Sequence, residues 1–187
     1  MQAAREAQKP PMKASDEATE EQLKMAREQG RAYVHALHEM AHEEADAGGE
    51  QPAGDYIVAY AVEHAEGMYH LKDGQLEWQE PTEENAHIEI AVRDAADNRF
   101  IPGLNVQVTV LDTQGEEVGT HTQPFLWHPW LWHYGRNWRV PGDGAYTLRV
   151  RIDAPDFHRH DKKNGQRYAQ PVAVEFENVE IKTGRKM

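Results

Sequence analysis

The spacing of apolar residues changes once along this 187-residue chain, near Asp55, and that change limits the folds open to it. Before Asp55, apolar residues recur every three or four positions, as on one face of an amphipathic helix. After it, they alternate with polar residues, as in strands that bury one face and expose the other. We therefore expect a helical extension followed by a larger β domain. The helical stripe comprises Leu23, Ala26, Tyr33, Leu37, Met40 and Ala41.

The N-terminal part is predicted to form one long helix. Its composition of Ala, Glu, Gln, Met and Leu favours a helix. Thr19 followed by Gln22 is a capping-box pattern at the start, and Gly48-Gly49 is the expected stop. The expected organisation of the whole chain is a disordered lead-in (1–14), a helix (15–47), a linker (48–54), a β-sandwich (55–182) and a short tail (183–187).

The alternating segments after Asp55 are short and are separated by turn residues. Ile88, Ile90 and Val92 are expected to face a core, and Asp73-Gly74 supplies the tight turn of a hairpin. Several such strands without any strand–helix–strand repeat predict a two-sheet β-sandwich and disfavour a parallel α/β fold. Further alternating segments lie at 56–62, 104–110, 146–152 and 172–176.

Composition narrows the functional classes. The 20 Lys and Arg against 32 Asp and Glu give a net charge of −12, which repels phosphate backbones and attracts cations. We therefore expect no nucleic-acid partner. The chain has no Cys, which excludes disulfides, thiolate nucleophiles and Cys-ligated metal centres. The mean hydropathy of −0.84 excludes a transmembrane helix, and no signal peptide is expected in the sequence as given.

The chain has eleven histidines, and His87-Ile-Glu89 is one of the patterns that could bind a metal. Residues at i and i+2 of a strand point to the same side, so this imidazole and this carboxylate project together, opposite the core-facing Ile88. Such a pair on a fixed strand is half of a transition-metal site. The alternative is a solvent-facing pair with no ligand.

The segment from Gln123 to Gly135 is rich in large aromatic side chains and contains two histidines, His128 and His133. Three interpretations stay open for it. It could cover one end of the sandwich or form a subunit interface, or it could present a platform for sugar rings. It could also form a desolvated wall that keeps both imidazoles neutral, as metal binding requires. The platform residues would be Trp127, Trp130 and Trp132.

Two further histidine patterns are less specific. His38, Glu39 and His42 match H-E-x-x-H, the pattern of zinc hydrolases, but such an enzyme needs a third ligand and a cleft. In a helix rich in His and Glu we interpret the match as incidental. His35 extends the same surface and could form an adventitious metal site with it. The segment 156–161 places two histidines at i and i+2 in a loop, and its alternative is a polar turn.

The order of these segments from about Asp55 to Ile181 resembles the periplasmic metal-binding proteins encoded beside bacterial iron permeases. The resemblance rests on short motifs in a fixed order. They are H-x-E at His87 and Glu89, H-Y-G at His133-Tyr-Gly135, G-x-Y-x-L at Gly144, Tyr146 and Leu148, and R-H at Arg159-His160.

The resemblance implies an all-β, immunoglobulin-like β-sandwich that forms a homodimer and binds copper and iron or manganese. Its implied ligands are His87, His133 and His160, with His160 coming from the partner subunit and Glu89 as a further ligand or base. The family has a Met where Phe125 and Leu126 follow a proline, and His128 is the nearest replacement. Without that thioether the site becomes better suited to Cu(II), Zn(II) or Fe(II).

The predicted function is therefore that of a metal-binding accessory protein without turnover chemistry, carrying Cu, Fe or Zn outside the cytoplasm. The resemblance implies a periplasmic location and an inner-membrane iron permease as partner. Two alternatives remain: a carbohydrate- or protein-binding sandwich with a Trp platform, and a zinc hydrolase using His38, Glu39 and His42. Metal affinity should fall as the pH drops through the histidine range, because ligand imidazoles must be neutral.

Overall fold

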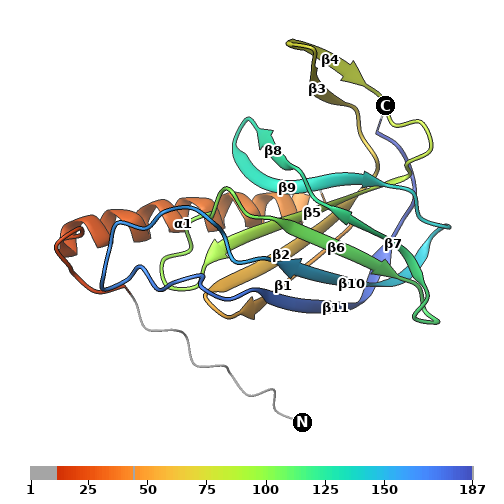
Figure 1. Ribbon diagram of the computed structural model, residues 1–187. Helices are drawn as coiled ribbons and strands as arrows, with labels where there is room; N and C mark the ends of the chain where they lie inside the picture. The colour runs from red at the N-terminus through yellow and green to blue at the C-terminus, as the bar shows by residue number, and fades with distance from the viewer. Residues whose placement is uncertain (1–11, 44, 187) are drawn as a thin grey trace.

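A computed structural model describes residues 12–43 and 45–186. It consists of one helix and two packed antiparallel sheets, with a smaller two-stranded sheet projecting from one end (Figure 1). The elements are α1 (Glu20–Glu43), β1 (Ala47–Ala53), β2 (Tyr56–Glu63), β3 (Met68–Lys72), β4 (Gln75–Gln79), β5 (Ala86–Asp94), β6 (Val106–Leu111), β7 (Glu117–Thr122), β8 (Phe125–His128), β9 (Leu131–Trp138), β10 (Gly144–Ile152) and β11 (Val172–Ile181).

The sandwich is the predicted fold. One sheet has the order β1-β2-β5-β9-β8 and the other β11-β10-β6-β7, and their facing sides enclose the core. Ile88, Ile90 and Val92 are fully buried there, as the alternation predicts. Removing this apolar surface from water, at about 25 cal/mol per Å², is the main source of stability. The all-β class with an N-terminal helical extension is confirmed.

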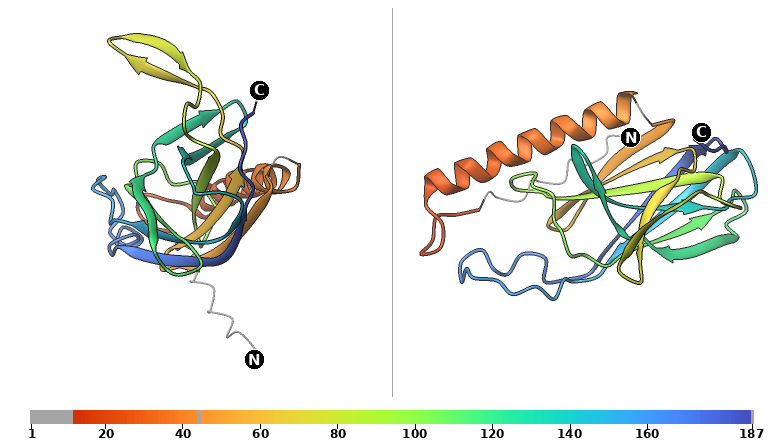
Figure 2. Two further views of the ribbon diagram at one scale, coloured as in Figure 1. Left: turned by 90° about the vertical axis from the view of Figure 1, so that its right-hand side faces the viewer. Right: turned by 90° about the horizontal axis from the view of Figure 1, so that it is seen from above.

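Helix α1 begins where the capping box places it. Gln22 donates its backbone N–H to Thr19 Oγ1 (3.2 Å), and the Thr19 N–H is donated to Gln22 Oε1 (2.8 Å). These two bonds satisfy groups that a helix start leaves without partners. The helix lies along the outer side of the five-stranded sheet (Figure 2). It is too polar to cross a membrane, and no other helix of the described residues has the length and apolar character to do so.

One glycine explains how closely the helix approaches the sandwich. A Cβ at Gly30 would lie 1.7 Å from the backbone oxygen of Asp97, in the turn after β5. Further along, Tyr33 donates its hydroxyl to the backbone oxygen of Trp132 on β9 (2.6 Å). The helix is therefore held against the turn that follows β5 and against β9, the neighbour of β5 in the sheet.

The segment 48–54 differs from the expected linker, because it forms most of β1. Ala47 pairs with Val62 and Ala53 with Tyr56, and the hairpin turns at Gly54, whose φ is +60°. Gly and Pro are poor strand formers, which is why this segment reads as a linker. An edge strand tolerates both, because one side of its backbone needs no partner. Gly48-Gly49 therefore belongs to β1, and the helix ends earlier, at Glu43.

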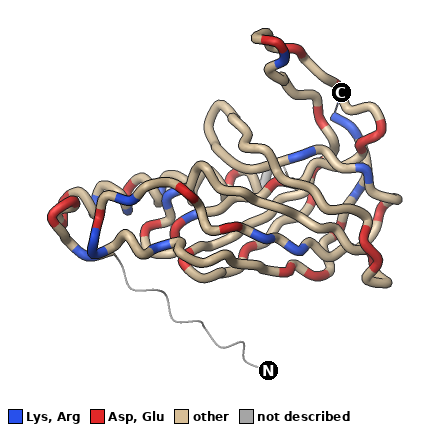
Figure 3. Tube along the Cα trace, in the orientation of Figure 1, with Lys and Arg blue, Asp and Glu red and all other residues tan. Residues whose placement is uncertain are grey.

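The two ends of the described chain also differ from expectation. Residues 1–11 of the predicted lead-in lie outside the described residues, but Lys13 exchanges hydrogen bonds with the side chain of Asn164. In the predicted tail, Thr183 donates to Asp143, and Lys186 forms ion pairs with Glu63 and Glu66. Figure 3 shows Lys and Arg interspersed with acidic residues along the chain.

Candidate metal centre

Strands β5 and β9 bring three of the predicted ligands together. Glu89 pairs with Gly135 in the antiparallel register, so His87, Glu89 and His133 project from the same side of neighbouring strands. One ligand atom from each residue lies within 4.8 Å of the others. His133 Nε2 is 3.0 Å from Glu89 Oε1, and His87 Nε2 is 3.5 Å from the same oxygen. All three side chains are buried.

Each of the three residues of the H-Y-G motif has a different role. His133 faces the cluster, while Tyr134 faces the core, where its hydroxyl donates to the Ile101 oxygen (2.8 Å). A Cβ at Gly135 would lie 3.0 Å from His87 Nε2 and 2.8 Å from a Leu126 methyl. The glycine therefore leaves the space in which the two imidazoles approach Glu89.

Asn137 determines which nitrogen of His87 is available. Its Nδ2 donates to the Glu66 backbone oxygen (2.7 Å), which directs Oδ1 toward His87 Nδ1 (2.9 Å). An amide oxygen only accepts, so Nδ1 carries the hydrogen. In the neutral ring Nε2 then holds a lone pair, and it faces Glu89. This is the orientation that a histidine ligand requires.

The unsatisfied polar atoms of the cluster test whether a metal ion fits. His87 Nε2, Glu89 Oε2 and both ring nitrogens of His133 are buried and make no hydrogen bond of acceptable geometry in the described part of the chain. Leaving such groups without a partner is costly. Two imidazole nitrogens and a carboxylate are a common ligand set for Cu(II), Fe(II) and Zn(II). The residues present therefore fit a transition-metal ion.

The ionisation of the cluster follows from its contacts. Burial opposes charge on Glu89, but the close, positively charged imidazoles of His133 and His87 outweigh it and hold the pKa of Glu89 well below its usual range. Burial lowers the pKa of His87, but Glu89 and Glu66 outweigh it, and the net result is a pKa raised above 6.5.

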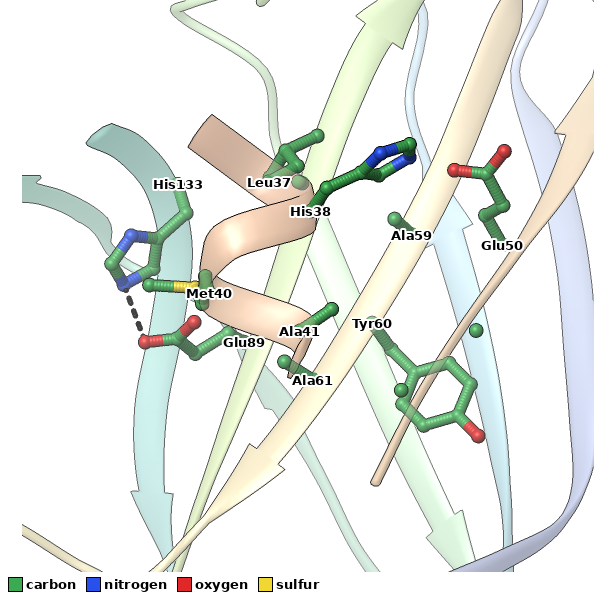
Figure 4. Close-up of a pocket in the computed structure, with 13 residues that line it drawn as sticks. Leu37, His38, Met40, Ala41, Glu50, Ala59, Tyr60, Ala61, Glu89 and His133 are labelled. Carbon is green, nitrogen blue, oxygen red and sulfur yellow. Dashed lines mark ion pairs between the residues drawn. The ribbon is translucent and has the colours of Figure 1, made fainter. Parts of the chain in front are cut away.

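The helix covers this cluster. A cavity of about 230 Å³ lies between α1 and the outer face of the five-stranded sheet, and both Glu89 and His133 reach it (Figure 4). Small sheet residues (Ala59, Ala61 and Ala91) leave room for the helix, whose side of the cavity is formed by Leu37, His38, Met40 and Ala41. The His–Glu pair of β5 is therefore buried, and the solvent-facing alternative is wrong.

The H-E-x-x-H pattern does not converge on this cluster. His38 lines the cavity, but its ring points away from His133, toward the side of Glu50 (Figure 4). Glu39 is on the exposed side of the helix, 3.5 Å from His35 Nε2. The side chain of His42 lies outside the described residues. Among the described side chains, no candidate metal-binding group includes His35, His38 or Glu39.

The structure does not bring His160 to the cluster within one chain. Its side chain is exposed, and Nδ1 is 3.9 Å from Glu17, just before α1 begins. The cluster lies near Met40, close to the other end of the helix. A helix rises 1.5 Å per residue, so about 30 Å separates the two places. His128 also stays apart, beside Trp130 (5.2 Å between ring centres), with its Nδ1 buried and unpaired in the described chain.

Sequence reasoning missed two acidic neighbours of the cluster. Glu63 is the register partner of His87, and Glu66 Oε1 is 3.8 Å from His87 Nε2. Together with Glu89 they form a second acidic group, which Lys186 neutralises in part. Glu63 follows the core-facing Val62 in β2, so the alternation along this strand predicts that Glu63 lies on the outer face of the sheet. Only the strand register places it beside His87.

Comparison with known proteins supports the fold. The family described as Fe2+ transport protein matches residues 40–182, so almost all of α1 precedes the matched part. FetP from uropathogenic Escherichia coli strain F11 is 22% identical, with a TM-score of 0.60, covering 73% of this chain and 95% of FetP. Copper-reconstituted P19 from Campylobacter jejuni is 18% identical, with a TM-score of 0.62, covering 75% of this chain and 97% of that one. Among curated proteins the search finds no match.

Proposed function

This chain belongs to the Fe2+ transport protein family, and on that premise we propose that it is a metal-binding accessory protein for iron or copper uptake outside the cytoplasm, without turnover chemistry. The observation that carries the proposal is the buried group of His87, Glu89 and His133, whose inward atoms have no hydrogen-bond partner in the described chain. Copper is bound in the solved structures of a FetP variant and of P19.

The chain's own residues account for binding and retention. Glu89 supplies a negative charge in a buried place, which lowers the cost of bringing in a cation. Asn137 holds the His87 ring in the tautomer that directs Nε2 inward. The ligands would be His87, Glu89 and His133, and a bound ion would supply Lewis acidity or redox chemistry. An inner-membrane iron permease is the partner that we propose for such a carrier.

The direct test is metal binding by the full chain without an affinity tag. By the Irving–Williams order we expect Cu(II) to bind tightest in vitro, with one tight equivalent per chain in a calorimetric titration. Fe(II) and Zn(II) should bind more weakly at the same site. Metal content after purification without added metal shows which ion the cell supplies. A titration with no saturable tight equivalent would contradict the proposed function.

Cu(II) affinity should depend on pH through His87. Because Glu89 raises the pKa of this imidazole above 6.5, the ion must displace its proton near neutral pH. Below that raised pKa the apparent affinity should fall by about tenfold per pH unit for each proton displaced, and above it the affinity should level off. Titrations from about pH 5.5 to 8.5 in buffers of different ionisation enthalpy measure both quantities. An affinity that does not change over this range would refute the assignment.

We also propose a homodimer whose interface lies at β8 and β9. Phe125, Trp130 and Trp132 are nearly half exposed, and Trp127 is 68% exposed. Phe125 and Trp132 stack with their ring planes 5° apart, which makes a flat apolar surface. Such a surface is costly to leave in water, at about 25 cal/mol per Å².

Sedimentation at micromolar concentration should therefore give a species of twice the 21.4 kDa chain mass. Trp127→Ala should shift it toward the monomer, whereas Trp78→Ala, on the projecting β4, should not. A wild-type chain that sediments only as a monomer would contradict the dimer. Those exposed rings would then favour the alternative of a sugar- or protein-binding platform.

A further inference from the structure

One sulfur atom, that of Met40, lies among the α1 residues that cover the cluster. Met40 is on the last part of α1, is only 5% exposed, and lines the same cavity as Glu89 and His133. Figure 4 shows its side chain extending from the helix toward these two residues. The thioether therefore faces two of the three groups that the site analysis assigns to a metal ion.

Packing alone does not require a thioether at this position. The opposite wall is made of Ala59, Ala61 and Ala91, against which a leucine would pack as well. A thioether differs from a leucine in being a weak acceptor and a soft metal ligand. On the sheet side of the same cavity, Glu89 and His133 carry the buried atoms Oε2 and Nε2, which have no hydrogen-bond partner in the described residues. The thioether thus shares a cavity with an incomplete ligand set.

The helix is held in a way that keeps Met40 there. Leu23 and Ala26 are buried, Gly30 allows close contact with the turn at Asp97, and Tyr33 is bonded to the Trp132 backbone. These contacts belong to the earlier turns of α1, so they fix the helix axis over β5 and β9. The last turns then extend across the cluster as a cover.

We propose that Met40 supplies a thioether ligand from α1 to the metal ion held by His87, Glu89 and His133. This inference rests on the proposed function. A soft sulfur donor added to two imidazoles shifts the preference of the site toward Cu(I). It also means that the end of α1, which covers the cluster, contributes directly to the metal site.

The test compares Met40→Leu with Met25→Leu. Met25 is on the same helix but is 54% exposed, so its change controls for the loss of a helical methionine. Leucine keeps the volume and apolar character of Met40, so the fold and the helix content by circular dichroism should be unchanged. Cu(I) affinity, measured by competition with bicinchoninate, should fall by at least about tenfold in Met40→Leu and stay unchanged in Met25→Leu. Zn(II) affinity should change much less.

X-ray absorption at the copper edge gives a second, independent measurement. The chain contains no Cys, so a sulfur neighbour of copper in the wild-type protein must come from a methionine. We expect one sulfur neighbour in the wild type and in Met25→Leu, and none in Met40→Leu. The wild-type spectrum is informative even if a variant fails to fold.

The outcomes separate this inference from the proposed function. If copper has only nitrogen and oxygen neighbours in the wild type, and Met40→Leu binds Cu(I) normally while His133→Ala loses it, Met40 is not a ligand and the metal-binding function stands. If the wild-type protein binds no copper, the proposed function itself is wrong. A sulfur neighbour that survives in Met40→Leu would assign the ligand to another methionine and overturn the inference.

Discussion

Replacing His133 by alanine is expected to weaken Cu(II) binding by at least about tenfold, the order of effect known for altered metal ligands and their supports. His133 Nε2 is 3.0 Å from Glu89 and is buried without a hydrogen-bond partner in the described residues. The substitution removes one of the two imidazole donors, and His87 is then the one imidazole of the cluster that still contacts the Glu89 carboxylate. Calorimetric titration of the folded variant, with its thermal midpoint measured alongside, gives the loss.

His38→Ala is the matched control for this experiment. His38 borders the same cavity, yet its ring points away from the cluster (Figure 4), so Cu(II) affinity should change little. A result in which His38→Ala abolishes binding and His133→Ala preserves it would move the site to the helix. The H-E-x-x-H pattern would then have to be taken as the metal-binding motif.

The alternation of β5 was sufficient to predict which residues share a side. Ile88, Ile90 and Val92 lie in the core, and His87 and Glu89 lie together on the other face. The same alternation could not reveal that the second face is buried as well. That depends on α1 packing over it, and a helical stripe does not say which surface it covers.

Two of the residues missed by sequence reasoning meet the cluster only through strand register. Asn137 and Glu63 are both register partners of His87, one on β9 and the other on β2. Neither residue's own segment shows which strand lies beside it, and single-strand parity gives only the face on which each lies. Register is set by how whole strands align through their turns and buried faces, so it is not readable from a short motif.

The position of His160 illustrates a different limit. The resemblance implies that the partner subunit supplies His160, and the geometry of a single chain cannot test that. In the described chain His160 lies beside Glu17, at the far end of α1 from the cluster. If it ligates the metal at all, it must do so in a second copy, as the resemblance implies, so its role depends on the proposed dimer.

A buried ion pair fixes the segment that carries His160, and removing this ion pair should destabilise the fold strongly. Asp94 is 1% exposed and accepts hydrogen bonds from Arg167 Nε (2.8 Å) and from the Tyr168 hydroxyl. Its other oxygen accepts the backbone N–H of Ala96 (2.5 Å) and of Asp97 (3.1 Å). This single carboxylate therefore joins the end of β5 to the loop before β11.

Asp94→Ala should cost about 3–5 kcal/mol in the free energy of unfolding, because it leaves a largely buried guanidinium without its carboxylate. Burial lowers the pKa of Arg167, but Asp94 outweighs it and the net pKa is raised, so the cation cannot escape the cost by losing its proton. Arg167 also contacts Asp55, at 3.8 Å from a carboxylate oxygen and 3.4 Å from the backbone oxygen, and both contacts are long. Chemical denaturation of the metal-free protein measures the loss.

Asp153→Ala is the control, since it removes an exposed ion pair with Arg151 and should cost less than about 1 kcal/mol. In Asp94→Ala the cluster residues on β5 and β9 are untouched, so the folded variant should still take up one equivalent of Cu(II). A loss in stability no greater than that of Asp153→Ala would mean that the Arg167 segment rearranges to regain a partner. The loop carrying His160 would then be adaptable, and its position in one chain would not constrain the contacts that it makes in a dimer.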